Sequence, residues 1–277
     1  MSRMRQGWEL TKKSWALLRS NPQLFRYPIV GTIVVLVLLL AFGVPALLLL
    51  DDNETVPGAI LAAVGIYAST FTGIFFSVAL AAAAGRVFDG QPTGFSDGLA
   101  VARAQTGAIA GWAALSVLVG VLISALQRLG GVGAAIASAI VGTAWSLVSF
   151  MAVPVLAFEG PGPWETLKRS ATLFRERWVG QVTGNVAVGA IVGFLVILPA
   201  ILLVVLGVVL WAGDEGEAGL AAGAILVAVG AVMFAVGALI SQAMRSVFGV
   251  ALYRYASTGT ASATFSEEEL RSAVRTK

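Results

Sequence analysis

Long apolar runs, separated by short polar segments, form the pattern of this chain. A helix needs roughly 20 apolar residues to cross the hydrocarbon core of a bilayer. Six stretches meet that length, and none of them contains Lys, Arg, Asp or Glu. They are Pro28–Leu50, Val56–Ala84, Gly107–Leu126, Gly130–Phe158, Val182–Ala212 and Ala218–Ile240. The pattern predicts an all-α, polytopic membrane protein with six transmembrane helices arranged as three hairpins.

The segments between the runs alternate in length and charge. Asp51–Val56 and Gly213–Glu217 are short and acidic, and Gln127–Leu129 is a tight turn. The longer connections, Gly85–Thr106 and Glu159–Gln181, carry basic residues. Every Lys and Arg other than Arg128 lies in the terminal segments or in these two longer connections. The positive-inside rule therefore predicts that both termini lie in the cytoplasm.

Composition narrows the range of functions. Only 12% of residues are charged and 58% are hydrophobic, whereas about a quarter of a soluble domain is charged. The chain has no His and no Cys, so the commonest general base, the commonest metal ligand and any thiolate are absent. We therefore expect no enzyme activity, no catalytic residue, no metal and no cofactor. The basic residues are scattered between apolar runs and form no patch, which argues against nucleic-acid binding.

One amphipathic phrase occurs twice: "WELTKKSWALLR" starts at Trp8 and "WETLKRSATLFR" starts at Trp164. In each copy, apolar residues recur at helical spacing and basic residues face away from them. A short basic helix with Trp at the edge of its apolar face is typical of the membrane interface. The residues that we expect to contact lipid at this interface are Trp8, Lys12, Lys13, Trp15, Trp164, Lys168, Arg169 and Trp178.

Each copy of the phrase precedes a predicted transmembrane hairpin, and a weaker version starts near Phe95 before the middle hairpin. We interpret residues 1–256 as one membrane domain with repeat units at 1–84, 95–158 and 164–256, each an interfacial helix followed by a hairpin. Residues 257–277 are expected to form a flexible cytoplasmic tail. The interfacial helices are either simple anchors or sites that bind lipid headgroups or a protein partner.

The stretches "GWELTKKSWALLRSNPQLFRYPIV" and "VPVLAFEGPGPWETLKRSATLFRERW" resemble a family of six-helix prokaryotic membrane proteins of unknown function. They are also distantly similar to the membrane domain attached to some glycerophosphodiester phosphodiesterases. The catalytic phosphodiesterase domain itself has no counterpart among these residues. The resemblance implies a fold and a location in the prokaryotic cytoplasmic membrane, and it carries no assigned activity.

Small residues recur every four positions through the second apolar run, at Gly65, Ser69, Gly73 and Ser77. Further pairs of this kind are Gly107 with Gly111, Gly189 with Gly193, and Gly219 with Gly223, and Gly223, Gly230 and Gly237 are spaced by sevens. Such faces let helices approach closely. The alternative interpretation is a stripe that faces a pore or forms an oligomer.

Ionisable residues are absent at bilayer depth, which argues against a proton-driven pump. They gather instead at the predicted cytoplasmic rim, where we expect a site that includes Arg86, Glu159, Arg245 and Arg254. The first three are predicted to line a chamber, and the alternative is that these residues only set the membrane boundary.

The sequence is consistent with two functions. The first is a non-enzymatic channel or passive transport protein, expected to be a homo-oligomer. The second is a membrane-organising or scaffold protein that binds lipid headgroups or a membrane partner through its interfacial helices.

Overall fold

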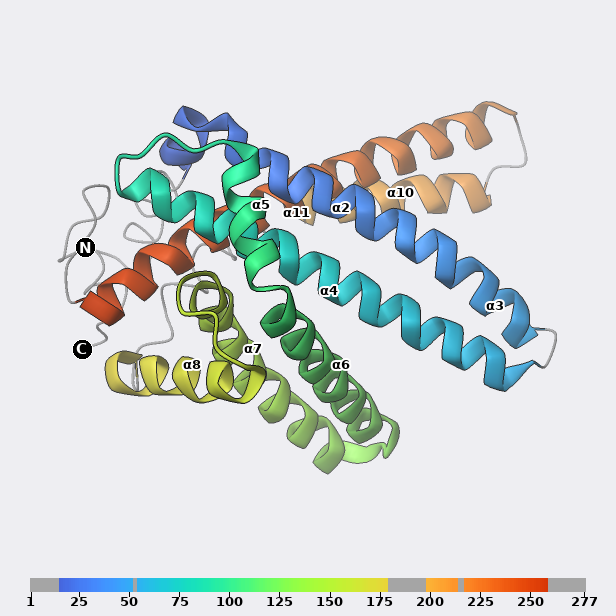
Figure 1. The fold of residues 1–277 in the computed structure, drawn as a ribbon. Coiled ribbons are helices and arrows are strands. Elements are labelled where there is room, and N and C mark those ends of the chain that lie inside the picture. Colours follow the sequence, from blue (N-terminus) through green and yellow to red (C-terminus); the bar gives the residue numbers. More distant parts are fainter. Residues whose placement is uncertain (1–14, 52–53, 179–197, 214–216, 259–277) are drawn as a thin grey trace.

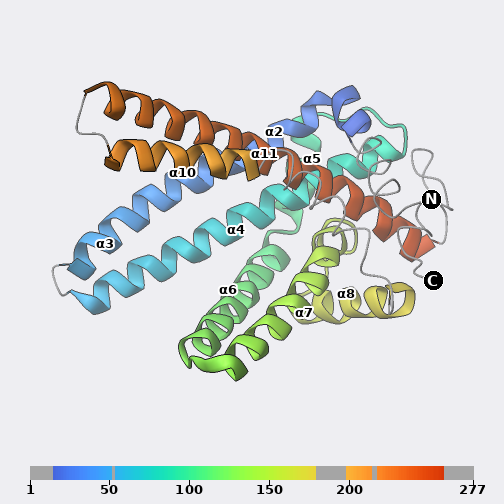
Figure 2. The same ribbon diagram turned by 180° about the vertical axis from the view of Figure 1, so that it is seen from behind.

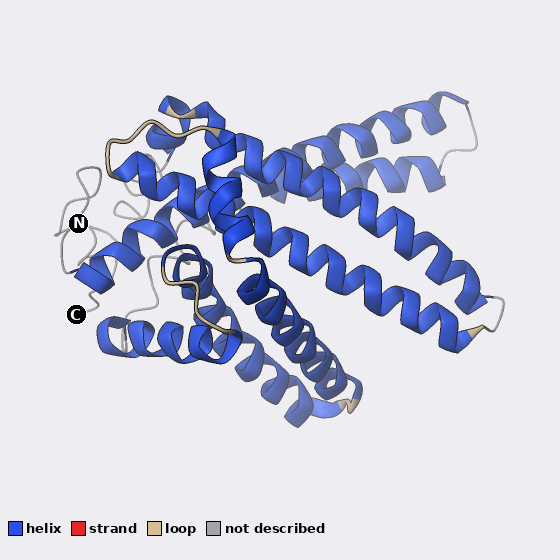
Figure 3. Ribbon diagram, viewed as in Figure 1, coloured by secondary structure: helices blue, strands red, loops and turns tan. Residues whose placement is uncertain are grey.

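The structure is a computed structural model that describes residues 15–51, 54–178, 198–213 and 217–258. Within these ranges the chain is helical and has no strand (Figure 3). The elements are η1 (Pro22–Phe25), α2 (Arg26–Leu38), η2 (Leu39–Gly43), α3 (Val44–Asp51), α4 (Thr55–Phe88), α5 (Phe95–Ala104), α6 (Thr106–Arg128), α7 (Gly131–Phe158), α8 (Pro163–Trp178), α10 (Leu198–Gly213) and α11 (Glu217–Thr258).

The described helices confirm a membrane-embedded protein. Five helical stretches are long and apolar enough to cross a bilayer: Pro22–Asp51, Thr55–Phe88, Thr106–Arg128, Gly131–Phe158 and Leu220–Thr258. The apolar helix at Leu198–Trp211 is shorter. The predicted span Val182–Ala212 lies partly outside the described residues, as do Gly189 and Gly193, so the count of six helices stays a prediction.

Three pairs of helices diverge from a common end (Figures 1 and 2). The segment α2–α3 runs beside α4, α6 beside α7, and α10 beside α11. We call the end where α5, α8 and the last part of α11 gather the closed end. The opposite end, where α3, α6 and α10 end and α4, α7 and α11 begin, is the open end.

Burial is concentrated at the closed end. In α4 the continuous buried stretch is Val78–Gly85, in α7 it lies within Met151–Ala157, and in α11 within Ala243–Ala256. At the open end, by contrast, Val56 and Leu129 are 69% and 77% exposed. Exposure of such apolar side chains costs free energy in water but not against lipid tails. The three diverging helix pairs are therefore compatible with a bilayer.

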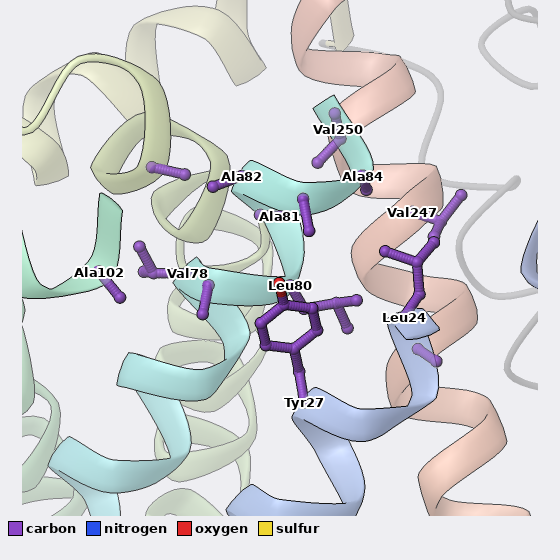
Figure 4. Close-up of a cluster of buried hydrophobic side chains, with 14 of the residues drawn as sticks. Leu24, Tyr27, Val78, Leu80, Ala81, Ala82, Ala84, Ala102, Val247 and Val250 are labelled. Atoms are coloured by element: carbon purple, nitrogen blue, oxygen red, sulfur yellow. The ribbon is translucent and has the colours of Figure 1, made fainter. Parts of the chain in front are cut away.

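Small side chains on α4 allow several elements to share the closed-end core. Ala81, Ala82 and Ala84 present only a methyl group each, and larger residues from other elements fill the space around them. Figure 4 shows this cluster, with labelled contributions from Leu24, Tyr27, Val78, Leu80, Ala102, Val247 and Val250.

The start of α2 is tied to the α4–α5 connection. The Tyr27 hydroxyl lies 3.0 and 3.1 Å from the carbonyl oxygens of Gly94 and Phe95, to which it donates. Gly98 in α5 sits directly against the Tyr27 hydroxyl and the Ala79 carbonyl, with no room for a Cβ atom. The glycine therefore lets α5 cross close over both α2 and α4.

Glycines also bring α10 and α11 together, as the small-residue spacing predicts. A Cβ atom on Gly223 would lie 2.7 Å from the Gly207 carbonyl oxygen, and one on Gly230 would lie 2.9 Å from the Ala200 carbonyl oxygen. These contacts are to backbone, which cannot move aside without separating the helices. Gly107 belongs to a predicted pair of the same kind, but nothing lies within 4 Å of a Cβ there.

This contrast gives a matched pair of variants. We expect Gly223→Val to destabilise the protein by roughly 1–3 kcal/mol, because the added side chain overlaps backbone in a tight helix pair. Gly107→Val removes the same kind of residue where space is open, so it should have little effect. Thermal unfolding in detergent measures both, and equal losses would contradict the packing role of Gly223.

Candidate functional site

A cavity of about 340 Å³ lies between α4, α7 and α11. Phe150, Val153 and Pro154 of α7 provide apolar walls. The polar part of the lining comes from all three helices and consists of Ser77, Ser149, Ser241, Gln242, Arg245 and Ser246. The lining among the described residues has no acidic side chain, so Arg245 gives the cavity a net positive charge.

Three of the lining hydroxyl groups have unsatisfied hydrogen-bonding capacity. The Oγ atoms of Ser149, Ser241 and Ser246 are buried and have no hydrogen-bond partner among the described residues. An unpaired buried hydroxyl costs free energy that a ligand or water can recover. Ser77 differs, because its hydroxyl donates to the Gly73 carbonyl at 2.8 Å and accepts from the Gln242 amide at 3.4 Å.

A second polar cluster at the closed end joins α4 to α11. The two terminal nitrogens of Arg254 lie 2.5 and 2.6 Å from the carboxylate oxygens of Asp89. Arg254 also donates to the Gly85 carbonyl at 3.0 Å. Asp89 follows the last residue of α4, where the helix dipole disfavours a negative charge. The Arg254 guanidinium offsets that effect and holds the pKa of the Asp89 carboxyl below its ordinary value of 3.8.

A third cluster joins α7, α8 and α11 around Glu159. The single N–H at Nε of Arg169 is shared between the two carboxylate oxygens of Glu159, at 2.9 and 3.1 Å, and the Tyr253 hydroxyl donates to Glu159 at 2.8 Å. The Tyr253 ring stacks on Phe158 with 5.3 Å between centroids. The Arg254 guanidinium lies 5.9 Å from the Phe158 ring, so this aromatic pair separates the two ion pairs.

Arg86 takes part in neither of these clusters. Its terminal nitrogen donates to the Pro92 carbonyl at 3.1 Å and lies 3.9 Å from the Asp97 carboxylate. Asp97 in turn accepts from the backbone N–H of Gly94 at 2.8 Å and caps α5. Arg86 therefore fixes the α4–α5 connection, and its buried Nε atom has no partner among the described residues.

The four residues predicted to form one rim site thus have four different sets of partners. Arg86 holds the α4–α5 connection, Glu159 binds Arg169 and Tyr253, and Arg254 binds Asp89. Arg245 lines the cavity, whose described lining includes neither Arg86 nor Glu159. Tyr253 donates to Glu159 and stacks on Phe158, whose ring lies near the Arg254 guanidinium. Among the described residues no ion pair joins Glu159 to Arg245.

The small-residue ladder of α4 divides into two parts. Toward the open end, Gly65 packs against Phe42, whose Cβ would lie 2.6 Å from a Cβ on the glycine. Gly73 has open space beside it, and the Ser69 hydroxyl is buried without a partner among the described residues. At the other end of the ladder Ser77 lines the cavity.

The helix α8 buries one face and exposes another. Thr166, Ser170 and Leu173 are buried against the bundle. On the outward side, Trp164 is 61% exposed and the Lys168 ammonium lies 5.5 Å from its ring centroid. Arg169, by contrast, is engaged with Glu159. Lys168 and Trp164 are therefore free to meet the membrane surface.

The other predicted interfacial residues are only partly described. Trp15 is 41% exposed and meets Phe25 edge-on at 6.1 Å, while Leu18 beside it is fully buried. Trp8, Lys12 and Lys13 lie outside the described residues. Trp178 ends α8, and its side chain is not described.

The fold and the apolar helices define an integral membrane protein of the helical class. Residues 58–263 match a family of unknown function, DUF6159, and the chain belongs to that family. Comparisons with curated proteins and with solved structures give no match. The distant similarity to the membrane domain of glycerophosphodiester phosphodiesterases has no support from these comparisons.

Most of the polar residues that line the cavity were not predicted from the sequence. Ser149, Ser241, Gln242 and Ser246 were not among the predicted site residues. A signal was present in the segment "SQAMRS" from Ser241 to Ser246, which places four polar residues at the end of an apolar run. Serines in apolar helices commonly bond to the preceding turn, as Ser116 does to the Trp112 carbonyl, so serine alone did not mark the site.

The Asp89–Arg254 ion pair predicts a pH-dependent contribution to stability. Because the pKa of Asp89 is lowered in the folded state, the ion pair stabilises above the ordinary pKa of 3.8 and is lost as pH falls below it. Asp89→Asn should lower the thermal midpoint at neutral pH by an amount that shrinks below pH 3.8. The partly exposed pair limits the effect to about 1 kcal/mol. A difference that grows on acidification would contradict this account.

The Tyr253–Glu159 hydrogen bond gives a second test. Tyr253→Phe keeps the ring on Phe158 and removes a donor from a carboxylate, so we expect a loss of about 1.5–3 kcal/mol. Tyr67→Phe is the matched control, since that exposed hydroxyl donates only to the neutral Ala110 carbonyl at 3.2 Å. Thermal unfolding should show the larger loss at Tyr253, and equal losses would refute a charge-assisted bond.

Proposed function

We propose that this protein is a non-enzymatic, membrane-organising protein that binds the headgroups of anionic lipids at its closed end. The observation that carries the proposal is the orientation of α8. Its inner face, with Thr166, Ser170 and Leu173, is buried, and its outer face presents Trp164 beside Lys168. An amphipathic helix held in this way places an aromatic ring and a cation at the headgroup layer.

The charge distribution supports the same side of the membrane. Among the described residues, Lys and Arg other than Arg128 lie toward the closed end, which the positive-inside rule assigns to the cytoplasm. The cytoplasmic leaflet carries anionic lipids, and a Lys or Arg near its surface gains about 1 kcal/mol. The location in a prokaryotic cytoplasmic membrane, with both termini inside, is part of this proposal.

The absence of cysteine makes a clean lipid-proximity experiment available. Thr172, exposed on α8, is changed to Cys and labelled with a donor fluorophore in proteoliposomes. Energy transfer to acceptor-labelled phosphatidylglycerol should exceed transfer to acceptor-labelled phosphatidylcholine. Adding Lys168→Gln should reduce the excess by up to about fivefold, because one charge near the surface is removed.

Lys168→Arg is the control, since it keeps the charge and should keep the excess. Arg169→Gln cannot replace Lys168→Gln in this test, because Arg169 is bound to Glu159 and its loss disturbs the fold. Equal transfer to both lipids from the labelled Thr172→Cys protein, with Lys168 unchanged, would overturn the proposal. The homo-oligomer expected from the sequence stays a prediction.

Passive transport is the second candidate. The observation in its favour is the unpaired Ser69 hydroxyl, eight residues before Ser77 on the same ladder of α4. If the protein transports a solute, the cavity would be the cytoplasmic entrance of a polar path along the Ser69–Ser77 face of α4. Ion and solute flux in proteoliposomes separates the candidates: a flux that Ser69→Val abolishes would favour transport, and lipid enrichment without flux would favour membrane organisation.

A further inference from the structure

The cavity between α4, α7 and α11 is the strongest unassigned feature of the described structure. It combines a cation, an amide and several hydroxyl groups with apolar walls. One of its residues, Ser241, is only 7% exposed, and its hydroxyl has no partner among the described residues. The hydroxyl groups of Ser149, Ser241 and Ser246 are therefore already desolvated and still have hydrogen-bonding capacity, and Arg245 is the exposed cation beside them.

The depth of the cavity follows from helix length. At 1.5 Å per residue, the axial distance from Val56 to Ser77 in α4 is about 32 Å. The first lining residues of the other two helices are Ser149 in α7, about 26 Å from Val132, and Ala238 in α11, about 27 Å from Leu220. The three helices thus reach the cavity after about 26 to 32 Å.

This length matches the hydrocarbon core of a bilayer, which is about 30 Å thick. The distances start at the open end, where charged residues indicate the membrane surface: Glu54 precedes α4, and Arg128 ends α6 just before α7. With the open end at one membrane surface, the cavity lies where acyl chains meet headgroups at the other surface. Arg245, one turn beyond Ser241, reaches into the headgroup layer.

The chemistry of the lining selects the ligand class. Arginine and hydroxyl donors together bind phosphate oxygens well, and a guanidinium can do so through two parallel hydrogen bonds. The lining has one cation and no described anion, which matches a singly charged phosphodiester. Phe150 and Val153 fit the apolar part of a ligand that continues toward the acyl chains.

We propose that this cavity binds a phosphate group, carried by a phospholipid of the leaflet at the closed end, with Arg245 as the anion-binding residue and Ser241, Ser246 and Gln242 as donors. The inference deepens the proposed function, because it adds an internal lipid site to the surface contact made by α8. The site is distinct from α8: Lys168 and Trp164 do not line the cavity.

Native mass spectrometry of the detergent-purified full chain tests the site. Three probes are used: short-chain phosphatidylglycerol, the diacylglycerol of the same chains, which lacks the phosphoglycerol headgroup, and inorganic phosphate. We expect retention of one phosphatidylglycerol per chain and no retention of the diacylglycerol. Arg245→Gln should weaken retention about tenfold, since it removes a charged hydrogen bond.

Arg103→Gln is the matched control, because Arg103 is an exposed arginine of α5 on the same side and does not line the cavity. It should leave retention unchanged. Ser241→Ala gives an independent readout. Removing an unpaired buried hydroxyl should leave the thermal midpoint unchanged or raise it, yet lower lipid retention severalfold. A purely structural serine would not show that combination.

The remaining outcomes identify or overturn the ligand. Displacement of the lipid by inorganic phosphate would assign the site to free phosphate, and failure to displace it would assign the site to the lipid. Equal retention of diacylglycerol, or equal retention by Arg245→Gln and the unmodified protein, would overturn the proposal. Lys168→Gln should leave retention intact, so a failure of the α8 proposal and a failure of the cavity proposal give different results.

Discussion

The close approach of helices at the closed end depends on the small side chains of α4. Between Val78 and Gly85 this helix offers mostly methyl groups or none, and α2, α5, α7 and α11 all come close to it. In lipid there is little hydrophobic drive for helices to associate, so close van der Waals contact is what holds them. A bulky residue in this stretch would push several elements outward at once.

Beyond that contact, polar links at the closed end add specificity. Arg254 joins α11 to the end of α4 through Asp89 and Gly85, and Glu159 joins α7 to α8 and α11 through Arg169 and Tyr253. These links lie outside the predicted hydrocarbon core, where water can solvate ions and the cost of burying charge is small. The open end has no such described links, and its apolar side chains face outward.

Hydropathy alone was enough to locate most of the membrane helices, because a run of apolar residues has only one stable environment. Hydropathy ended the sixth span near Ile240, but helical continuation past that point to Arg254 and Tyr255 was predictable, and α11 runs unbroken from Glu217 to Thr258. The burial of its last part at the closed end was not predictable from the sequence. The ion-pair partners of the charged residues could not be predicted from the sequence either. Asp89 and Arg254 are 165 positions apart, and either could have remained solvated. The tight contacts at Gly223 and Gly230 were predictable from spacing, whereas the open space at Gly107 was not.

The length of α11 has a mechanical consequence. It is continuous over 42 residues, or about 63 Å, and contains no proline that would create a hinge. Its first half lies among lipid tails and its last turns carry Tyr253 and Arg254 into the closed-end clusters. The helix can therefore tilt as one rigid rod, and its midpoint lies near the cavity. A tilt of about 10° that moves the open tip by roughly 5 Å displaces the other tip by a similar distance in the opposite direction.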